Sequence, residues 1–174
     1  MRQLLPGIPV AETFVDVQEP AVGDVVDAAV EDGAAIVVPL LLSTGYHTNV
    51  DISRAVGAHP VRAVATAALG PHKLLADVLH DRLSAAGARP GDAIVLAAAG
   101  SSDPAAAVDV AAMADLLAAR LDAEVSIGFA AGAGPRIGDV VSAARHAGAA
   151  RVIIASYVLA PGYFAQVIAA VVRG

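Results

Sequence analysis

His47 is the side chain best suited to bind a metal ion or transfer a proton. It follows an apolar run and a Ser-Thr-Gly turn, within Pro-Leu-Leu-Leu-Ser-Thr-Gly-Tyr-His-Thr-Asn-Val-Asp-Ile at residues 39–52. An imidazole binds divalent metals and exchanges protons near neutral pH. A loop histidine that caps the next helix fits the position equally well, so position alone leaves both interpretations open.

Two carboxylates, Asp16 and Glu19, follow an earlier apolar run in Phe-Val-Asp-Val-Gln-Glu-Pro. A carboxylate at the end of one strand, with a histidine from the next strand, would suit metal capture and proton transfer. For Glu19 the alternative is favoured: its charge stabilises the N-terminus of the following helix through the helix dipole.

A Gly-Ser-Ser-Asp-Pro turn at residues 100–104 contains Ser101 and Ser102 after another apolar run. Such a turn could offer backbone N–H groups to an anion at a helix N-terminus. A plain strand-to-helix turn capped by Asp103, with Pro104 at the first helical position, is at least as well supported. Neither a Gly-x-Gly-x-x-Gly pattern nor a P-loop lysine is present.

The remaining histidines fit surface positions. His72 and His80 lie eight residues apart on one expected helix, too far for a two-histidine metal pair at i, i+4. His59 precedes a proline and His146 lies in a helix, so neither indicates a site.

Composition excludes several classes of protein. The 174 residues carry a net charge of -6, contain no cysteine, and are 57% hydrophobic with a mean hydropathy of +0.67. The apolar runs are far shorter than the ~20 residues of a membrane span, and no signal peptide is evident. Disulfides and thiolate metal sites are excluded, and few aromatic residues and the acidic charge argue against nucleic acid. We expect a cytoplasmic protein.

Strands and helices alternate along the chain. Apolar runs predict strands near 10–15, 36–42, 61–65, 94–98, 124–129 and 152–158, and helical spacing predicts helices at 20–30, 71–86, 104–121, 136–147 and 162–172. Helix 104–121 is expected to face the sheet with Val108, Ala111, Ala112, Leu116 and Leu117. The alternation predicts an α/β fold with mostly parallel sheets, whose sites gather at the carboxyl ends of the strands.

The sequence repeats itself. A shift of about 115 residues aligns 10–37 with 125–152, with about 13 identities in roughly 28 positions. Two similar flavodoxin-like halves are predicted, at 1–88 and 89–174. His47, Asp16 and Glu19 fall opposite Phe164, Ala131 and Gly134, so only the first half is polar there. Each half is expected to lack about one strand–helix unit, the first at its N-terminal end and the second at its C-terminal end.

These stretches resemble the class II tetrapyrrole chelatases, the sirohydrochlorin chelatases of the CbiX/SirB kind. The segment at 39–52 carries the resemblance, with the segment around Asp16, the turn at 100–104 and Ser-Tyr-Val-Leu-Ala-Pro-Gly-Tyr-Phe at 156–164 in the same order. The resemblance implies an ATP-independent lyase that inserts Co²⁺ or Fe²⁺ into sirohydrochlorin for cobalamin or sirohaem, with no permanently bound cofactor.

The resemblance also implies the site. His47 matches the second of two family histidines, and Asp16 matches an acidic position where glutamate is common, so these two are the expected metal and catalytic residues. The first family histidine belongs to a His-Gly-Ser turn whose strand the repeat places before Met1, and Ala99 stands at the second-half equivalent. Donors for the substrate carboxylates are expected at two turns, from Ser43, Thr44, Gly45, Ser101 and Ser102.

Two other classes of function stay open. A tetrapyrrole or metal carrier would bind without catalysing, and a small-molecule binder of the periplasmic type would need an export signal, which is not evident. The expected partners are sirohydrochlorin and a divalent metal, with neither nucleic acid nor membrane. Exposed sheet edges would favour a homo-oligomer.

Overall fold

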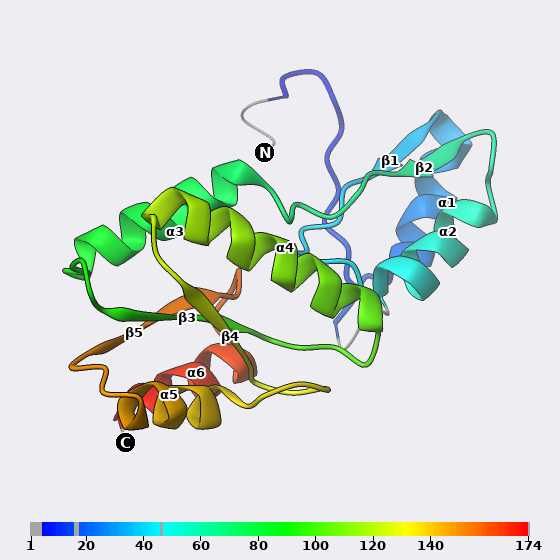
Figure 1. Cartoon of the computed structure of the whole chain (residues 1–174). Coiled ribbons are helices and arrows are strands. Elements are labelled where there is room, and N and C mark those ends of the chain that lie inside the picture. The colour runs from blue at the N-terminus through cyan, green and yellow to red at the C-terminus, as the bar shows by residue number, and fades with distance from the viewer. Residues whose placement is uncertain (1–4, 16–17, 46, 174) are drawn as a thin grey trace. The chain divides into compact units, whose positions relative to one another are not determined.

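The computed structural model describes residues 5–15, 18–45 and 47–173, and the side chains of 47–49 and 173 lie outside that description. The chain alternates helices with parallel strands in two similar halves, as predicted (Figure 1). It divides into two compact units. Unit 1 comprises Met1–Pro39 and Tyr46–Ala67, and unit 2 comprises Leu40–Gly45 and Ala68–Gly174.

Unit 1 is a small sheet covered by helices on one face. Its elements are α1 (Val22–Asp32), β1 (Ala35–Val37), the π-helical turn η2 (His47–Ile52), α2 (Ser53–Gly57) and β2 (Ala63–Ala65). β1 and β2 pair in parallel, with Ile36 opposite Val64. The core consists of Val22, Val26 and Val30 from α1 with Ala55 and Ala63.

Two of the predicted strands differ most from the structure. In the expected strand at 10–15 the structure shows only a single parallel bridge, from Phe14 to Ala21. The expected strand at 36–42 ends at Val37, because its continuation bonds elsewhere: the carbonyl of Leu41 accepts from the N–H of Leu69 at 2.8 Å. Pro39, which has no N–H to donate to a sheet, stands between the two parts of the run.

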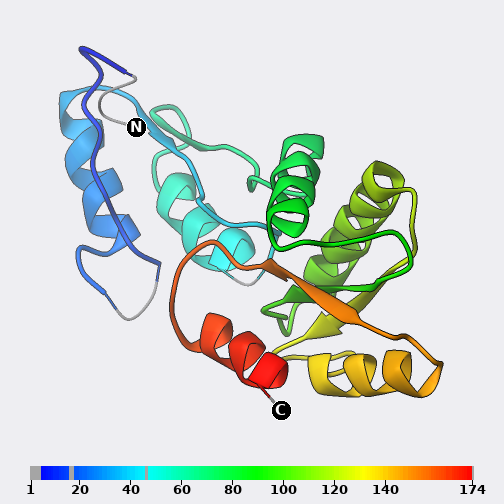
Figure 2. The same ribbon diagram turned by 90° about the vertical axis from the view of Figure 1, so that its left-hand side faces the viewer.

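Unit 2 is a three-layer α/β sandwich. It contains α3 (Lys73–Ala85), β3 (Ala93–Ala98), α4 (Pro104–Leu121), β4 (Val125–Phe129), α5 (Ile137–His146), β5 (Val152–Tyr157) and α6 (Tyr163–Arg173). All pairings are parallel, in the order β4-β3-β5. Figures 1 and 2 show α3 and α4 on one face of this sheet and α5 and α6 on the other.

The central strand β3 supplies the core of both layers. Leu96 is fully buried in the cluster with Met113 and Leu117 of α4. Val95, its neighbour in the chain, is fully buried in the opposite cluster with Ile137 of α5 and Ile168 of α6. Side chains alternate across a strand, so an unbroken apolar run suits a strand covered on both faces.

The prediction of which side of α4 faces the sheet is wrong. Of the five residues expected to face the sheet, only Leu117 is fully buried, and Val108 is 68% exposed. The buried set is Ala106, Val110, Met113, Ala114 and Leu117. The helix is apolar on nearly every side, so its sequence has little periodicity to define a face.

The internal repeat is visible in the backbone. The N–H of Phe14 donates to the carbonyl of Pro20 at 3.0 Å, and the N–H of Phe129 donates to the carbonyl of Pro135 at 2.9 Å. The four residues are matched pairs of the repeat. A helix follows each bridge, α1 in the first half and α5 in the second.

The boundary between the two sequence repeats does not coincide with the boundary between the two compact units. Helix α3, which the sequence analysis assigns to the first repeat (1–88), packs against α4 in unit 2 through Leu79 and Leu83. The boundary near residue 88 therefore stays a prediction about the repeat. No helix within the described residues is long and apolar enough to cross a membrane.

Candidate functional site

A cavity of about 350 Å³ lies within unit 1. Phe14 and Val15, at the end of the first apolar run, form one part of its lining. Asp51 of η2, Arg54 of α2 and Asp27 of α1 add charged side chains. The lining of this open cavity therefore combines three charged groups with apolar side chains, a composition that ligand sites share.

The two predicted metal-binding residues belong to the segments that border this cavity. Asp16 follows the lining residue Val15 directly, and itself lies outside the described residues. His47 is the first residue of η2, the π-helical turn that also contains Asp51. Turns of this kind are rare and frequently occur at functional sites.

The side chain of His47 lies outside the described residues, as does the whole of Asp16. Among the side chains that are described, no three of the His, Asp and Glu type gather closely enough to hold a metal ion. The metal-binding role of His47 and Asp16 therefore stays a prediction.

The charged groups around the cavity differ in their partners. The carboxylate oxygen Oδ1 of Asp27 lies 2.6 Å from the ring Nε2 of His59, and the two groups form a hydrogen-bonded pair. Arg54 is exposed, so its guanidinium can meet a ligand from solvent. An arginine fork matches a carboxylate in geometry and charge, so this residue suits an acidic ligand.

In unit 2, the segment Leu40–Gly45 is held by hydrogen bonds that the sequence analysis missed. Both the N–H and the hydroxyl of Thr44 donate to the same carboxylate oxygen of Asp109, the N–H at 2.7 Å. The hydroxyl of Tyr157 donates to the carbonyl of Leu42 at 2.7 Å. Burial, and secondly the charge of Asp109, raise the pKa of Tyr157 to about 12, so this hydroxyl stays protonated.

One feature of the sequence could have identified Asp109 as a residue with a structural partner. It is one of few ionisable residues in α4, a helix made mostly of alanine and other apolar residues. The structure shows it half-buried instead of solvated. Its partner lies 65 residues away in the chain, and no local pattern predicts that pairing.

The turn at 100–104 has the predicted helix cap. The carboxylate of Asp103 accepts from the N–H of Ala105 at 2.9 Å, and Pro104 is the first residue of α4. The hydroxyl of Ser101 accepts from the N–H of Asp103 at 3.1 Å, whereas Ser102 is exposed. The cap is confirmed, and substrate binding by Ser101 and Ser102 stays a prediction.

Gly45, in the turn at 43–45, lies close to Ser101 in the turn at 100–104. A methyl group in place of its hydrogen would lie 3.4 Å from the Ser101 hydroxyl oxygen. Three of the predicted substrate-binding residues, Thr44, Gly45 and Ser101, are thus neighbours in unit 2. Both donors of Thr44 already have a partner in Asp109.

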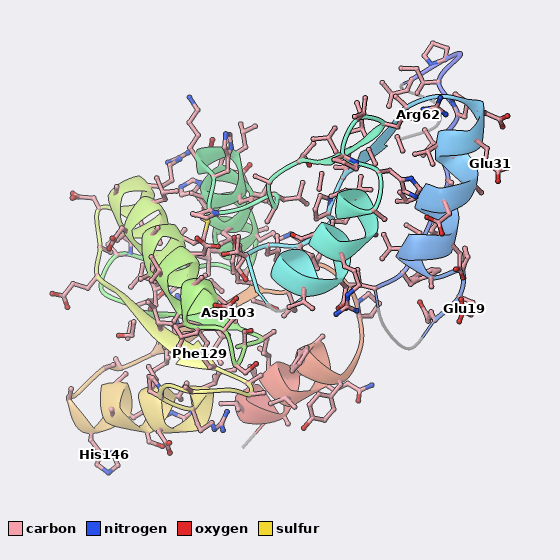
Figure 3. The ribbon with its side chains drawn as sticks, turned by 90° about the vertical axis from the view of Figure 1, so that its right-hand side faces the viewer. Glu19, Glu31, Arg62, Asp103, Phe129 and His146 are labelled. Atoms are coloured by element: carbon pink, nitrogen blue, oxygen red, sulfur yellow. The ribbon has the colours of Figure 1, made fainter. Side chains whose placement is uncertain are left out.

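The other polar candidates have structural partners. His72 caps α3, its Nδ1 accepting from the N–H of Leu74 at 3.2 Å, and His80 lies 3.2 Å from Asp81. Figure 3 shows His146 projecting outward from the end of α5 and Glu19 on the loop before α1. Glu19 is exposed and lies three residues before the start of α1, and its stabilisation of that helix N-terminus stays a prediction.

Comparison with known proteins identifies the family. The family model CbiX matches residues 1–86 and 93–173. The chain belongs to the CbiX family. A solved structure, "SirB from Bacillus subtilis with Fe3+", matches with a TM-score of 0.80 and 30% sequence identity, covering 97% of this chain and 71% of that one. The comparison with curated protein sequences gave no match.

Membership of the CbiX family confirms the predicted resemblance and fold class. The match covers both halves of the chain and therefore includes the segments around Asp16, His47 and Ser101. Ala99, which the sequence analysis expects at the second-half equivalent of the first histidine, has a carbonyl that accepts from the N–H of Ala131 at 2.8 Å. The second half therefore offers no imidazole at this position.

Proposed function

We propose that this protein is a sirohydrochlorin chelatase, which inserts Co²⁺ or Fe²⁺ into sirohydrochlorin without ATP. The CbiX family match and the likeness to SirB, a protein solved with Fe³⁺, support a chelatase-type activity. One structural observation carries the proposal furthest. The cavity of unit 1 is bordered both by the segment leading to Asp16 and by the turn that begins at His47.

The reaction needs a group that holds the metal weakly and groups that accept protons. Insertion forms bonds from the metal to the four ring nitrogens and releases two pyrrole protons. His47 and Asp16 would bind the incoming divalent ion and accept these protons, because imidazole and carboxylate are basic and ligate both cobalt and iron. The ligand types therefore do not determine whether cobalt or iron is inserted.

Sirohydrochlorin carries eight carboxylates, which require cationic or N–H donors. Arg54 is the basic residue that lines the unit 1 cavity. We assign it to one substrate carboxylate, since a charge-assisted, forked hydrogen bond to guanidinium gives both strength and orientation. The net charge of -6 does not oppose this assignment, because contacts at close range outweigh distant, screened charges.

The test is an absorbance assay of metal insertion. Sirohydrochlorin is mixed with Co²⁺, and separately with anaerobic Fe²⁺, with and without the protein, and the spontaneous rate is subtracted. We expect acceleration by the protein and its loss in His47→Ala. The matched control is His146→Ala, which removes an exposed histidine at the end of α5.

Each outcome has a distinct meaning. Near-normal turnover by His47→Ala would remove the role given to His47. Tight binding of sirohydrochlorin without any acceleration would replace the enzyme with the carrier interpretation. Absence of both binding and acceleration would overturn the proposed function for this chain.

A further inference from the structure

Strand β5 forms an open edge of the unit 2 sheet. In the order β4-β3-β5, its inner side pairs with β3, and no strand within the described residues pairs with its outer side. The carbonyl of Arg151 accepts from the N–H of Ala93 at 3.0 Å. The alternate residues Val152 and Ile154 therefore direct their N–H and C=O groups to the open edge. The sequence of β5, Val-Ile-Ile-Ala-Ser-Tyr, contains no charge or proline that would protect such an edge.

A cavity of about 330 Å³ lies at this edge. Its lining includes Val152, Ile153 and Ile154 of β5. Ala86, the C-cap residue of α3, and Val171 of α6 add to the lining, and these two helices cover opposite faces of the sheet. An added strand would lie in this hollow and send alternate side chains toward each face.

The first half of the repeat has a strand at the matching edge. Val37 of β1 corresponds to Val152 of β5. β1 pairs in parallel with β2, and the carbonyl of Val37 accepts from the N–H of Thr66 at 2.9 Å. The N–H of Ala35 donates to the carbonyl of Arg62 at 2.8 Å. The edge of β5 presents the same main-chain groups and can accept a parallel strand in the same way.

The charges at the helix end beside this edge are reversed between the halves. In unit 1, Nη1 of Arg62, just before β2, donates to the carbonyl of Val30 at 2.8 Å. Helix α1 then ends with Glu31 and Asp32. The residue that corresponds to Val30 is Arg145, an exposed residue in the basic last turn of α5 that lines the cavity. Charge complementarity therefore favours an acidic residue where β2 has Arg62.

We propose that the open edge of β5 binds an extended, acidic segment of another polypeptide chain as a further parallel strand of the unit 2 sheet. Main-chain hydrogen bonds to Val152 and Ile154 give the attachment, and the pockets on either side of the strand take its apolar side chains. An acidic residue beside Arg145 sets the direction and register of the strand. None of these residues has a role in the proposed chelatase reaction, so the two proposals are tested independently.

The probe is a peptide copied from the strand that occupies the matching edge in unit 1. It has the sequence of residues 60–67, Pro-Val-Arg-Ala-Val-Ala-Thr-Ala, with blocked ends, and is compared with the same peptide carrying Arg62→Glu. Each peptide is titrated into the ¹⁵N-labelled full chain, and the amide signals of Val152 and Ile154 report binding. We expect the Arg62→Glu peptide to bind about 5-fold more tightly, because it replaces a like-charge contact at Arg145 with an opposite-charge one.

A charge exchange on the protein tests the contact with Arg145. Arg145→Glu should reverse the preference, so that the unmodified peptide binds more tightly. Arg136→Glu, at the other end of the same helix, should keep the preference for the Arg62→Glu peptide. Both arginines are exposed, so neither exchange should prevent folding. A preference that Arg145→Glu leaves unchanged would overturn the inference.

Methylation of the peptide nitrogen separates strand pairing from simple occupation of the hollow. In unit 1 the N–H of Thr66 faces β1, whereas the N–H of its neighbour Ala65 faces away. N-methylation at Thr66 of the peptide should abolish the shifts, and N-methylation at Ala65 should not. Binding that is insensitive to both methyl groups, or no shift at millimolar peptide, would overturn the inference. A dimer of the free protein by light scattering, with the β5 amides already protected from hydrogen exchange, would also overturn it, because a second copy would then occupy the edge.

Discussion

The hydroxyl of Tyr157, at the end of β5, donates a 2.7 Å hydrogen bond to the carbonyl of Leu42. Tyr157 is only 4% exposed, and the acceptor belongs to a segment without secondary structure of its own. The bond therefore links the last strand of unit 2 to a stretch of chain that precedes every helix and strand of that unit. It satisfies a carbonyl that a sheet would otherwise have paired.

Tyr157→Phe tests this link. We expect the free energy of unfolding to fall by about 1 kcal/mol, because the carbonyl of Leu42 loses its partner while the ring still fills its space. Tyr163→Phe is the control, since Tyr163 is 70% exposed. Urea denaturation of both variants measures the difference. Equal stability of the two would mean that water replaces the Tyr157 hydroxyl without loss.

Gly70→Ala tests the close approach at the same link. A methyl group at Gly70 would lie 2.2 Å from the Tyr157 hydroxyl oxygen and 2.4 Å from the Leu42 carbonyl oxygen. We expect a loss of about 1–3 kcal/mol in unfolding free energy, as for overpacking in general. Gly138→Ala, with nothing within 4 Å of the added methyl, should leave the protein as stable or slightly more so. A Gly70→Ala protein with a wild-type melting temperature would contradict the packing.

Asp92→Asn tests an ion pair that sets a pH dependence. Asp92 accepts from the Nε and Nη2 of Arg151 at 2.8 and 2.6 Å and from the N–H of Arg89 at 2.6 Å. These contacts, that of Arg151 first, lower its pKa from 3.8 to about 2. A lowered carboxyl pKa stabilises the fold above the unfolded value, and this contribution is lost as pH falls from about 4 to about 2.

The measurement is the unfolding free energy of wild type and Asp92→Asn between pH 6 and pH 2. Wild type should be the more stable at pH 6, and the difference should shrink below pH 4. Asp115→Asn, at an exposed site, should show neither effect. A gap that stays constant down to pH 2 would show that the ionisation of Asp92 is not its source.

Arg54→Ala tests the substrate contact proposed in unit 1. Loss of one charge-assisted hydrogen bond to a carboxylate should raise KM for sirohydrochlorin by about 10-fold and leave kcat nearly unchanged. Arg82→Ala, an exposed arginine in the last turn of α3, serves as the control. A fall in kcat alone, with KM unaltered, would contradict the assignment of Arg54 to substrate binding.

Local signals in the sequence predicted much of the fold. β3, β4 and β5 lie within one residue of the expected runs, and α4 has the predicted bounds of residues 104–121. The cap by Asp103 followed local chemistry, because the carboxylate and the N–H that it accepts from are two residues apart. The predicted repeat reappears as matched hydrogen bonds at Phe14 and Phe129.

The misses share a physical cause. The buried face of helix α4 was predicted wrongly because alanine and other apolar residues lie on almost every side of the helix. Hydrophobicity therefore distinguishes no side of such a helix. The short helix α2 and the turn η2 were not predicted, because the sequence at 47–57 mixes polar and apolar residues without a clear period. The run at 36–42 was given one strand, although its second part leaves the sheet.

By itself, the sequence determined the α/β class, the internal repeat, and His47 and Asp16 as the candidates for metal chemistry. The tertiary structure decided that Leu40–Gly45 joins unit 2, that Asp109 receives both donors of Thr44, and that Gly70 must be small. Periodicity and caps act over a few residues and leave a local record. The partners of Asp109 and Tyr157 lie 65 and 115 residues away, and chain folding alone brings such groups within hydrogen-bonding distance.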